Sequence, residues 1–179
     1  FWTLDLKVTH DTLVPRPDTE ILVETVLKLP LDQHANIVDL GTGTGAIALA
    51  LASERPQWQV TATDIYAPTL DVAQDNAVRH GLMQVKFACG AWFEALEQQQ
   101  FDLIVSNPPY IDPDDVHMQK LKSEPERALV ADKQGIADIE TILPSDFRDG
   151  KKAMKLYLTV GGIVFGIMIL IIIVEKLIK

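Results

Sequence analysis

The sequence has 179 residues, enough for one domain with a substantial hydrophobic core. Its formal net charge of −9 argues against a general nucleic-acid binder, because phosphate contacts usually require a basic face. The one cysteine, Cys89, excludes an intrachain disulfide framework and favours a reducing compartment such as the cytoplasm. The chain opens in mid-pattern at Phe1 without a recognisable signal peptide, which indicates a fragment or a processed chain.

Strand-like and helix-like segments alternate through the first two thirds of the chain. The strand-like runs are apolar or β-branched, and the helix-like runs end at Pro56 and Gly81. The pattern predicts strands at 35–40, 58–64, 84–89 and 101–106, and helices at 46–55 and 67–81. This alternation is typical of an α/β fold with a parallel sheet and helices on both faces. Ligands of such folds bind at the carboxyl ends of the strands, near the point where the strand order reverses.

A glycine-rich loop follows the first predicted strand, in the sequence DLGTGTG (39–45). Its glycines allow the backbone to turn tightly and approach a ligand, with a helix N-terminus just beyond. With Ala46 the loop also fits the relaxed dinucleotide pattern G-x-G-x-x-A, so alone it does not separate NAD from other adenosyl ligands. Asp64 ends the next strand, 19 residues after Gly45, where a carboxylate can accept hydrogen bonds from ribose hydroxyls. The candidate cofactor-binding residues of the loop are Gly41, Thr42, Gly43, Thr44 and Gly45.

The fourth predicted strand runs into Asn107, Pro108, Pro109 and Tyr110. Two prolines stiffen this corner, and the Pro108 carbonyl has no competing N–H beside it. The Asn107 side-chain oxygen and the Pro108 carbonyl form a pair of acceptors that suits a substrate –NH2 group. Tyr110 can stack on a planar amide or base. The motif therefore favours a methyltransferase that acts on an amide or exocyclic amine over a dehydrogenase.

The motifs DLGTGTG, Asp64 and NPPY, in this order and spacing, resemble the class I S-adenosylmethionine-dependent methyltransferases. The segments LVPRPDTE (13–20), ASERP (52–56), WF (92–93) and EPERALVADKQGIADI (124–139) narrow the resemblance. Together they resemble the HemK-type glutamine N5-methyltransferases of peptide-chain release factors, over about residues 1–143. The implied fold is the Rossmann-like methyltransferase sheet, here incomplete because the later strands are not recognisable after Leu143.

The resemblance implies S-adenosylmethionine as cofactor and the Gly-Gly-Gln motif of class I release factors as substrate. It places the glycine loop on the methionine end of the cofactor, Asp64 on the ribose and Trp92 along the adenine. The resemblance also implies that Asn107 lies at the junction of cofactor and substrate, and that the segment from Asn107 to Tyr110 binds the glutamine amide. Arg16 and Glu20 border the site as framework or substrate-positioning groups, or form an ion pair within the turn. Ala91 stands where the family usually has an acid, which removes one acceptor for the adenine amino group.

Two other functions stay open at this point. NPPY also serves N6-adenine and guanine-N2 methyltransferases of nucleic acids, although the acidic charge and the PRPDTE segment count against a stable nucleic-acid partner. An inactive, cofactor-binding or membrane-tethered remnant is the other alternative. The histidines and acids do not show metal-ligand spacing, so no metal site is predicted.

The carboxyl-terminal part differs in composition from the rest. Residues 1–145 contain 10 Lys and Arg against 22 Asp and Glu, whereas residues 146–179 contain 6 against 3. We therefore expect a core domain over 1–145, a linker over 146–155 and a separate segment over 156–174. This last segment has 19 consecutive uncharged residues and would span roughly 28 Å as a helix, at ~1.5 Å per residue. The expectation is a transmembrane helix that contacts a membrane, with a fifth sheet strand as the alternative.

Overall fold

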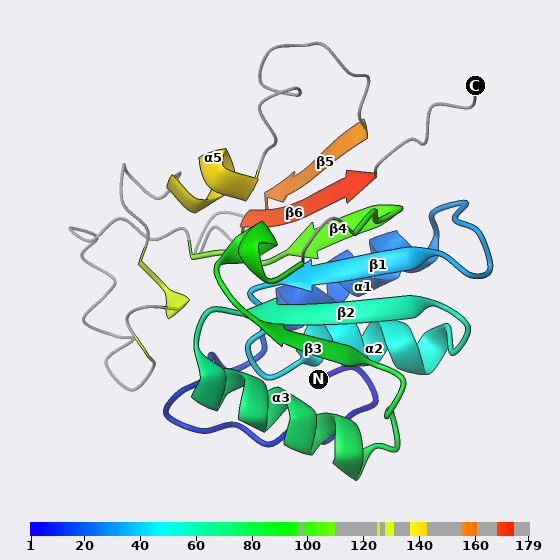
Figure 1. The fold of residues 1–179 in the computed structure, drawn as a ribbon. Helices are drawn as coiled ribbons and strands as arrows, with labels where there is room; N and C mark the ends of the chain where they lie inside the picture. Colours follow the sequence, from blue (N-terminus) through cyan, green and yellow to red (C-terminus); the bar gives the residue numbers. More distant parts are fainter. Residues whose placement is uncertain are drawn as a thin grey trace.

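A computed structural model of the chain describes residues 1–96, 99–109, 125, 128–130, 137–142, 155–160 and 168–173. Figure 1 shows a twisted sheet with helices packed against it. In chain order the elements are α1 (Pro17–Leu27), β1 (Asn36–Leu40), α2 (Ala46–Glu54), β2 (Gln59–Asp64), α3 (Ala67–Arg79), β3 (Lys86–Cys89), η1 (Trp92–Leu96), β4 (Leu103–Ser106), α5 (Ala137–Ile142), β5 (Lys155–Val160) and β6 (Met168–Ile173). The four strands and two helices predicted from the sequence are confirmed, with ends that differ by at most two residues.

The strands form one sheet in the order β3-β2-β1-β4-β6-β5. The pairs β1–β2, β2–β3 and β1–β4 are parallel, so the predicted parallel sheet is confirmed for these four strands. The order runs outward from β1 to β3 in one direction and from β1 to β4 in the other. The reversal therefore lies between β1 and β4, and the loops after these two strands flank it.

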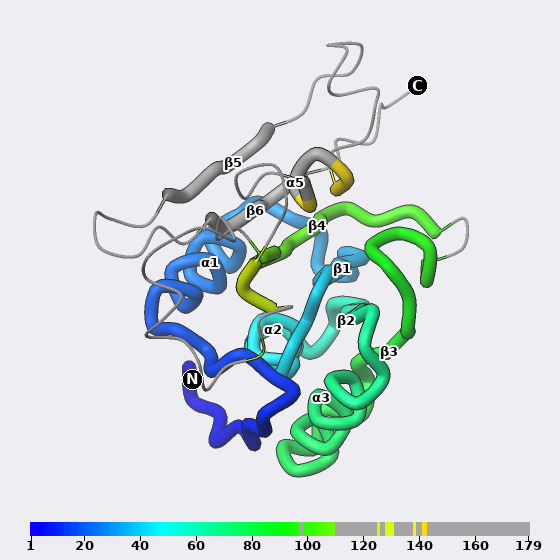
Figure 2. The backbone as a smooth tube through the Cα atoms, turned by 90° about the vertical axis from the view of Figure 1, so that its left-hand side faces the viewer, coloured from blue at the N-terminus to red at the C-terminus, as the bar shows by residue number. Residues whose placement is uncertain are grey.

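Each face of the sheet has its own hydrophobic cluster because alternate residues of a strand point to opposite faces. Ile37, Val60 and Leu103 pack with side chains of α1, α2 and α3 on one face. Val38, Leu40 and Ile104 pack with side chains of η1 and α5 on the other. Figure 2 shows α1, α2 and α3 together on one side of the strands. Helical elements thus cover both faces, as predicted.

Helix α1 was not predicted, because its first residues belong to the proline-rich segment PRPDTE. Proline is tolerated at the start of a helix, where its missing N–H would have no intrahelical partner. Pro17 occupies this position, and Arg16 precedes it with extended backbone. The helix buries Leu22, Val23 and Val26 against the sheet and α2.

The helix predicted over 156–174 is wrong for the part of this segment that the structure describes. Residues 155–160 and 168–173 are strands β5 and β6, which pair with each other in antiparallel fashion. β6 also pairs antiparallel with β4, from Leu103 opposite Ile173 to Ser106 opposite Leu170. The sequence MILIII of β6 is rich in β-branched residues, which favour strands, and β4 offers an edge to pair with. Among the described residues, no helix has the length and hydrophobicity needed to cross a bilayer.

The predicted division at 146–155 is not tested, because only Lys155 of that range lies within the described residues. The pairing of β6 with β4 joins the segment 156–174 to the same sheet as β1.

Candidate functional site

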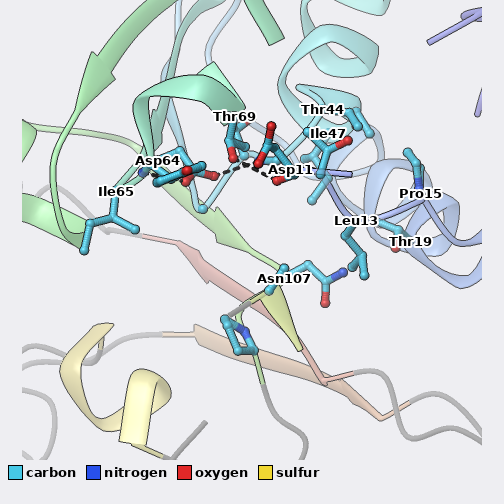
Figure 3. A pocket seen from close by; sticks show the side chains of 18 of the residues that line it. Asp11, Leu13, Pro15, Thr19, Thr44, Ile47, Asp64, Ile65, Thr69 and Asn107 are labelled. Carbon is cyan, nitrogen blue, oxygen red and sulfur yellow. Dashed lines mark hydrogen bonds between the residues drawn. The ribbon is translucent and has the colours of Figure 1, made fainter. Parts of the chain in front are cut away.

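A cavity of about 250 Å³ lies at the carboxyl ends of β1, β2 and β4. Its walls come from the glycine loop, the end of β2, the segment around Trp92, the start of α1 and the chain around Asp11 to Leu13. Figure 3 shows Asp64 and Thr69 on one side of it and Asn107 on another. The cavity thus lies beside the reversal of strand order, where the sequence predicts a ligand.

The glycine loop contains glycines with left-handed backbone, which agrees with the tight turn predicted from its sequence. Gly43 and Gly45 have φ values of +58° and +84°, a region that other residues rarely adopt. A Cβ on Gly45 would come within 3.0 Å of Leu49 and 3.3 Å of Ala73, so this glycine also allows α2 and α3 to pack closely. A Cβ on Gly43 would meet no atom within 4 Å. The position of a side chain on Gly43 is therefore open, and Gly43 also lines the cavity.

Asp39, the first residue of DLGTGTG, connects the glycine loop to the first turn of α2 through its buried side chain. Its Oδ2 accepts hydrogen bonds from the Thr42 hydroxyl at 2.6 Å and from the Ala48 backbone N–H at 3.2 Å. The side chain is fully buried, and its Oδ1 has no hydrogen-bond partner within the described residues. Burial raises the pKa of the Asp39 carboxyl to about 7, against the lowering effect of the bonds from Thr42 and Ala48. The negative charge of Asp64 adds to this increase of the pKa.

Asp64 stands at the end of β2, as predicted, and its carboxylate is oriented by the backbone. Oδ2 accepts from the Gly43 N–H at 3.1 Å, and Oδ1 accepts from the Tyr66 N–H at 3.0 Å. The first bond connects the end of β2 to the glycine loop after β1. The backbone therefore holds this acid beside the loop in the cavity wall.

Two buried side-chain oxygens on the cavity wall have no hydrogen-bond partner within the described residues. One is Oδ1 of Asn107, directly after β4, and the other is Oγ1 of Thr19, in the first turn of α1. Buried polar groups are normally satisfied, so an unsatisfied one requires an explanation. A ligand that donates to the Asn107 oxygen and bonds to the Thr19 hydroxyl would satisfy both.

Trp92 forms part of the wall next to the glycine loop. Its Cζ3 lies 3.6 Å from the position of a Cβ on Gly41, so the ring packs alongside the loop. Its φ of +49° is unusual for an aromatic residue. Such a conformation persists only where the surrounding structure enforces it, often at a functional site.

Most of the predicted site residues meet at this cavity. Those on its wall are Gly41, Thr42, Gly43, Thr44, Asp64, Trp92, Asn107 and Pro109. Gly45 is instead the N-cap of α2, and Pro108 is buried behind the wall. Tyr110 lies outside the described residues. Among the described residues, no cluster of three or more His, Cys, Asp or Glu side chains could hold a metal ion.

The residues of the PRPDTE segment have two different positions: some line the cavity, and others make contacts outside it. Arg16 lines the cavity, whereas Glu20 accepts a hydrogen bond from the Trp2 backbone N–H at 2.5 Å. The sequence interpretation did not identify Asp11, Thr12 or Thr19 as residues of the cavity wall, because none of them lies at a strand end. For Thr19 the useful signal is structural: a buried hydroxyl without a partner.

Comparison with known proteins gives the family. Residues 16–131 match the methyltransferase small domain family, which covers more than half of the chain. The chain belongs to that family. It is 47% identical over 163 residues to the release factor glutamine methyltransferase of Coxiella burnetii, across 90% of this chain and 56% of that relative. It is 50% identical over 145 residues to the protein of the same name from Escherichia coli K12, across 80% of this chain and 52% of that relative.

The resemblance to release factor glutamine methyltransferases found in the sequence is thus confirmed, and the chain spans about half the length of the curated relatives it matches. Solved structures agree on the methyltransferase fold. The hMettl16 catalytic domain in complex with the MAT2A 3'UTR hairpin 6 gives a TM-score of 0.69 at 13% identity, across 96% of this chain and 75% of that one. A methyltransferase from Pyrococcus furiosus gives 0.59 at 21% identity, across 95% and 88%. At these identities the likeness concerns the fold alone.

Proposed function

We propose that the chain binds S-adenosylmethionine and transfers its methyl group to the side-chain amide nitrogen of glutamine in the Gly-Gly-Gln motif of class I release factors. About half of the aligned residues are identical to those of proteins named release factor glutamine methyltransferase, which supports this assignment. The observation that carries it is the buried Asn107 Oδ1, which has no partner within the described residues and belongs to the wall of the cavity. Such an acceptor suits the N–H of a carboxamide.

The residues present fit S-adenosylmethionine. The glycine loop leaves open space beside Gly43 in the cavity wall, and Asp64 is a carboxylate oriented to receive ribose hydroxyls. Trp92 supplies a flat apolar surface beside the loop for the adenine. The unsatisfied Thr19 hydroxyl offers one further polar contact. When bound, the cofactor supplies an electrophilic methyl group on a positively charged sulfur.

The contribution of this chain to the reaction is alignment. An amide nitrogen is a poor nucleophile because its lone pair is delocalised into the carbonyl. The Asn107 oxygen would accept one N–H bond of the substrate amide, and so restrict the direction of its lone pair. The role of the Pro108 carbonyl as the second acceptor stays a prediction, since Pro108 is buried and does not line the cavity. Proximity and orientation of this kind can lower a barrier by at most about 7–11 kcal/mol. No strong base is required beforehand, because the proton becomes acidic only after the nitrogen is methylated. The stacking role of Tyr110 stays a prediction, since that residue lies outside the described part of the chain.

The proposal leads to a two-part experiment on the full chain. Calorimetric titration should detect S-adenosylmethionine binding, and NAD at the same concentration should not compete. Incubation with a class I release factor should then add one methyl group to the glutamine of its Gly-Gly-Gln motif. Tight NAD binding would contradict the cofactor assignment. Cofactor binding followed by methylation of an adenine or guanine base, and not of the release factor, would contradict the substrate assignment.

A further inference from the structure

Asn76, on the inner face of α3, has a fully buried side chain that bonds to two separate segments. Its Oδ1 accepts from the Lys7 backbone N–H at 2.7 Å. Its Nδ2 donates to the Lys7 carbonyl at 3.0 Å and to the Thr44 carbonyl at 3.0 Å. These partners fix the orientation of the amide, because a carbonyl must face its nitrogen and an N–H must face its oxygen. One carboxamide thus connects the chain near the amino terminus to the glycine loop.

Both segments continue into the cavity wall. Thr44 itself lines the cavity. The other segment, residues 1–13, is named here the N-terminal strap, and its residues Asp11, Thr12 and Leu13 line the same cavity. Figure 1 shows the strap running beside α3. The position of Asn76 therefore relates two walls of the cavity to each other.

Hydrogen bonds connect the strap to itself and to α3 between Lys7 and the cavity. Thr9 and Thr12 bond reciprocally: the Thr12 hydroxyl accepts from the Thr9 N–H at 3.0 Å, and the Thr12 N–H donates to the Thr9 carbonyl at 3.2 Å. The Thr69 hydroxyl of α3 donates to the Asp11 carbonyl at 3.0 Å. Asn76 and Thr69 therefore hold the strap to α3 at two points, at Lys7 and at Asp11, and the second point lies in the cavity wall.

We propose that Asn76 is a positioning residue, which sets the distance between the glycine loop and the strap that cofactor binding requires. This inference rests on the proposed function, because it concerns the same cavity. Asn76 does not line the cavity and acts through Thr44 and Lys7. Loss of its bonds should weaken cofactor binding more than it slows methyl transfer at saturating cofactor.

The test is Asn76→Asp, which keeps the size of the side chain but removes both donors. The Thr44 and Lys7 carbonyls would then face a carboxylate in a buried site. Asp75→Asn is the matched control, because it removes the charge from an exposed ion pair between α3 and the strap, the Lys7–Asp75 pair at 2.7 Å. We expect Asn76→Asp to weaken the binding of S-adenosylhomocysteine by roughly tenfold or more, and Asp75→Asn by less than about twofold. Turnover at saturating S-adenosylmethionine should change little in either variant.

A merely structural role would lower the Tm of Asn76→Asp and leave the dissociation constant of the folded variant within about twofold of the wild type. That result would overturn the inference. If the variant does not fold, hydrogen exchange of the wild-type chain provides the test. S-adenosylhomocysteine should slow hydrogen exchange at the Lys7 amide, which lies outside the cavity wall, together with the amides of the glycine loop. Protection of the loop without protection of Lys7 would contradict the coupling. A wild-type chain that binds neither S-adenosylmethionine nor S-adenosylhomocysteine would contradict the proposed function and the inference together. If the wild type binds S-adenosylhomocysteine and Asn76→Asp binds it equally well, the inference alone is contradicted.

Discussion

Replacing Asp39 by Asn should change the free energy of unfolding in a way that depends on pH. The free energy of unfolding of the variant minus that of the wild type should be larger at neutral pH than at acidic pH. Asp39 is fully buried, and burial raises the pKa of its carboxyl to about 7. In the unfolded chain the pKa of an aspartate is about 4. Between these values the unfolded chain binds fewer protons than the folded protein, so the free energy of unfolding falls as the pH rises. Below pH 4 the Asp39 carboxyl is protonated in both states and does not lower the free energy of unfolding. Above pH 7 it lowers the free energy of unfolding by a constant amount.

The magnitude follows from the difference between the two pKa values. It corresponds to a cost on the order of 4 kcal/mol at pH 8, of which about 3 kcal/mol develops between pH 5 and pH 8. The Asn side chain can still accept from Thr42 and Ala48. Its –NH2 group replaces Oδ1, which has no partner within the described residues, so a buried donor without an acceptor subtracts about 1–3 kcal/mol at every pH. The pH-dependent part is therefore the diagnostic quantity.

Urea unfolding of both proteins at pH 5, 6, 7 and 8 measures this quantity. The free energy of unfolding of Asp39→Asn minus that of the wild type should increase by about 3 kcal/mol from pH 5 to pH 8. Effects of the other titratable groups largely cancel in this difference, because both proteins contain them. A difference that stays constant within about 0.5 kcal/mol across this range would refute the reasoning that burial keeps Asp39 protonated.

Four further changes test the site and the sheet. Asp64→Ala should weaken S-adenosylmethionine binding by about 1.5–3 kcal/mol in a calorimetric titration, since hydrogen bonds to a charged group are lost; an unchanged affinity would remove Asp64 from the ribose role. Thr19→Val should leave the free energy of unfolding equal or slightly higher, because it removes an unsatisfied buried hydroxyl, yet weaken cofactor binding by roughly 1 kcal/mol; equal affinity would mean that the hydroxyl does not contact the cofactor. Asn107→Ala should lower turnover far more than cofactor affinity, and equal losses in both would assign Asn107 to the cofactor pocket alone. A chain that ends at Leu143 should aggregate more than the full chain in size-exclusion chromatography, because the edge of β4 loses its pairing with β6; a more soluble short chain would contradict this role of β6.

The parallel part of the fold was predictable because its signals are local. The runs that become β1, β2 and β4 are short and largely apolar or β-branched. The glycine loop directly follows β1, Asp64 ends β2, and Asn107 directly follows β4. Helices α2 and α3 each end two residues before a proline or a glycine, Pro56 and Gly81. Strand ends meet at one edge of a parallel sheet, so the glycine loop, Asp64 and Asn107 could be assigned to one site before their distances were known.

The carboxyl-terminal segment was misread because its length and lack of charge satisfy the criterion for a membrane helix. An uninterrupted apolar run does not distinguish a helix from buried strands by periodicity. The deciding factor is tertiary: β4 provides an edge, and β6 pairs with it through β-branched residues. Hydropathy along the chain contains no information about that edge.

The polar contacts of the site depend on tertiary structure even more strongly. Asn76 and Lys7 are 69 residues apart in sequence, and nothing local to either indicates their double hydrogen bond. The unsatisfied hydroxyl of Thr19 becomes apparent only when every neighbouring donor and acceptor is placed. The sequence could therefore identify the chemistry of the strand ends but not the network that holds them in position.

The most direct test of the proposed function is methyl transfer by the full chain from isotopically labelled S-adenosylmethionine to two peptides that differ at one position. One peptide contains Gly-Gly-Gln and the other Gly-Gly-Glu in the same context. The account predicts one labelled methyl group on the glutamine nitrogen of the first peptide and none on the second, because a carboxylate has no N–H to donate to the Asn107 oxygen. Equal labelling of both peptides, or labelling of neither while the chain binds the cofactor, would contradict the claim that this site methylates a glutamine amide.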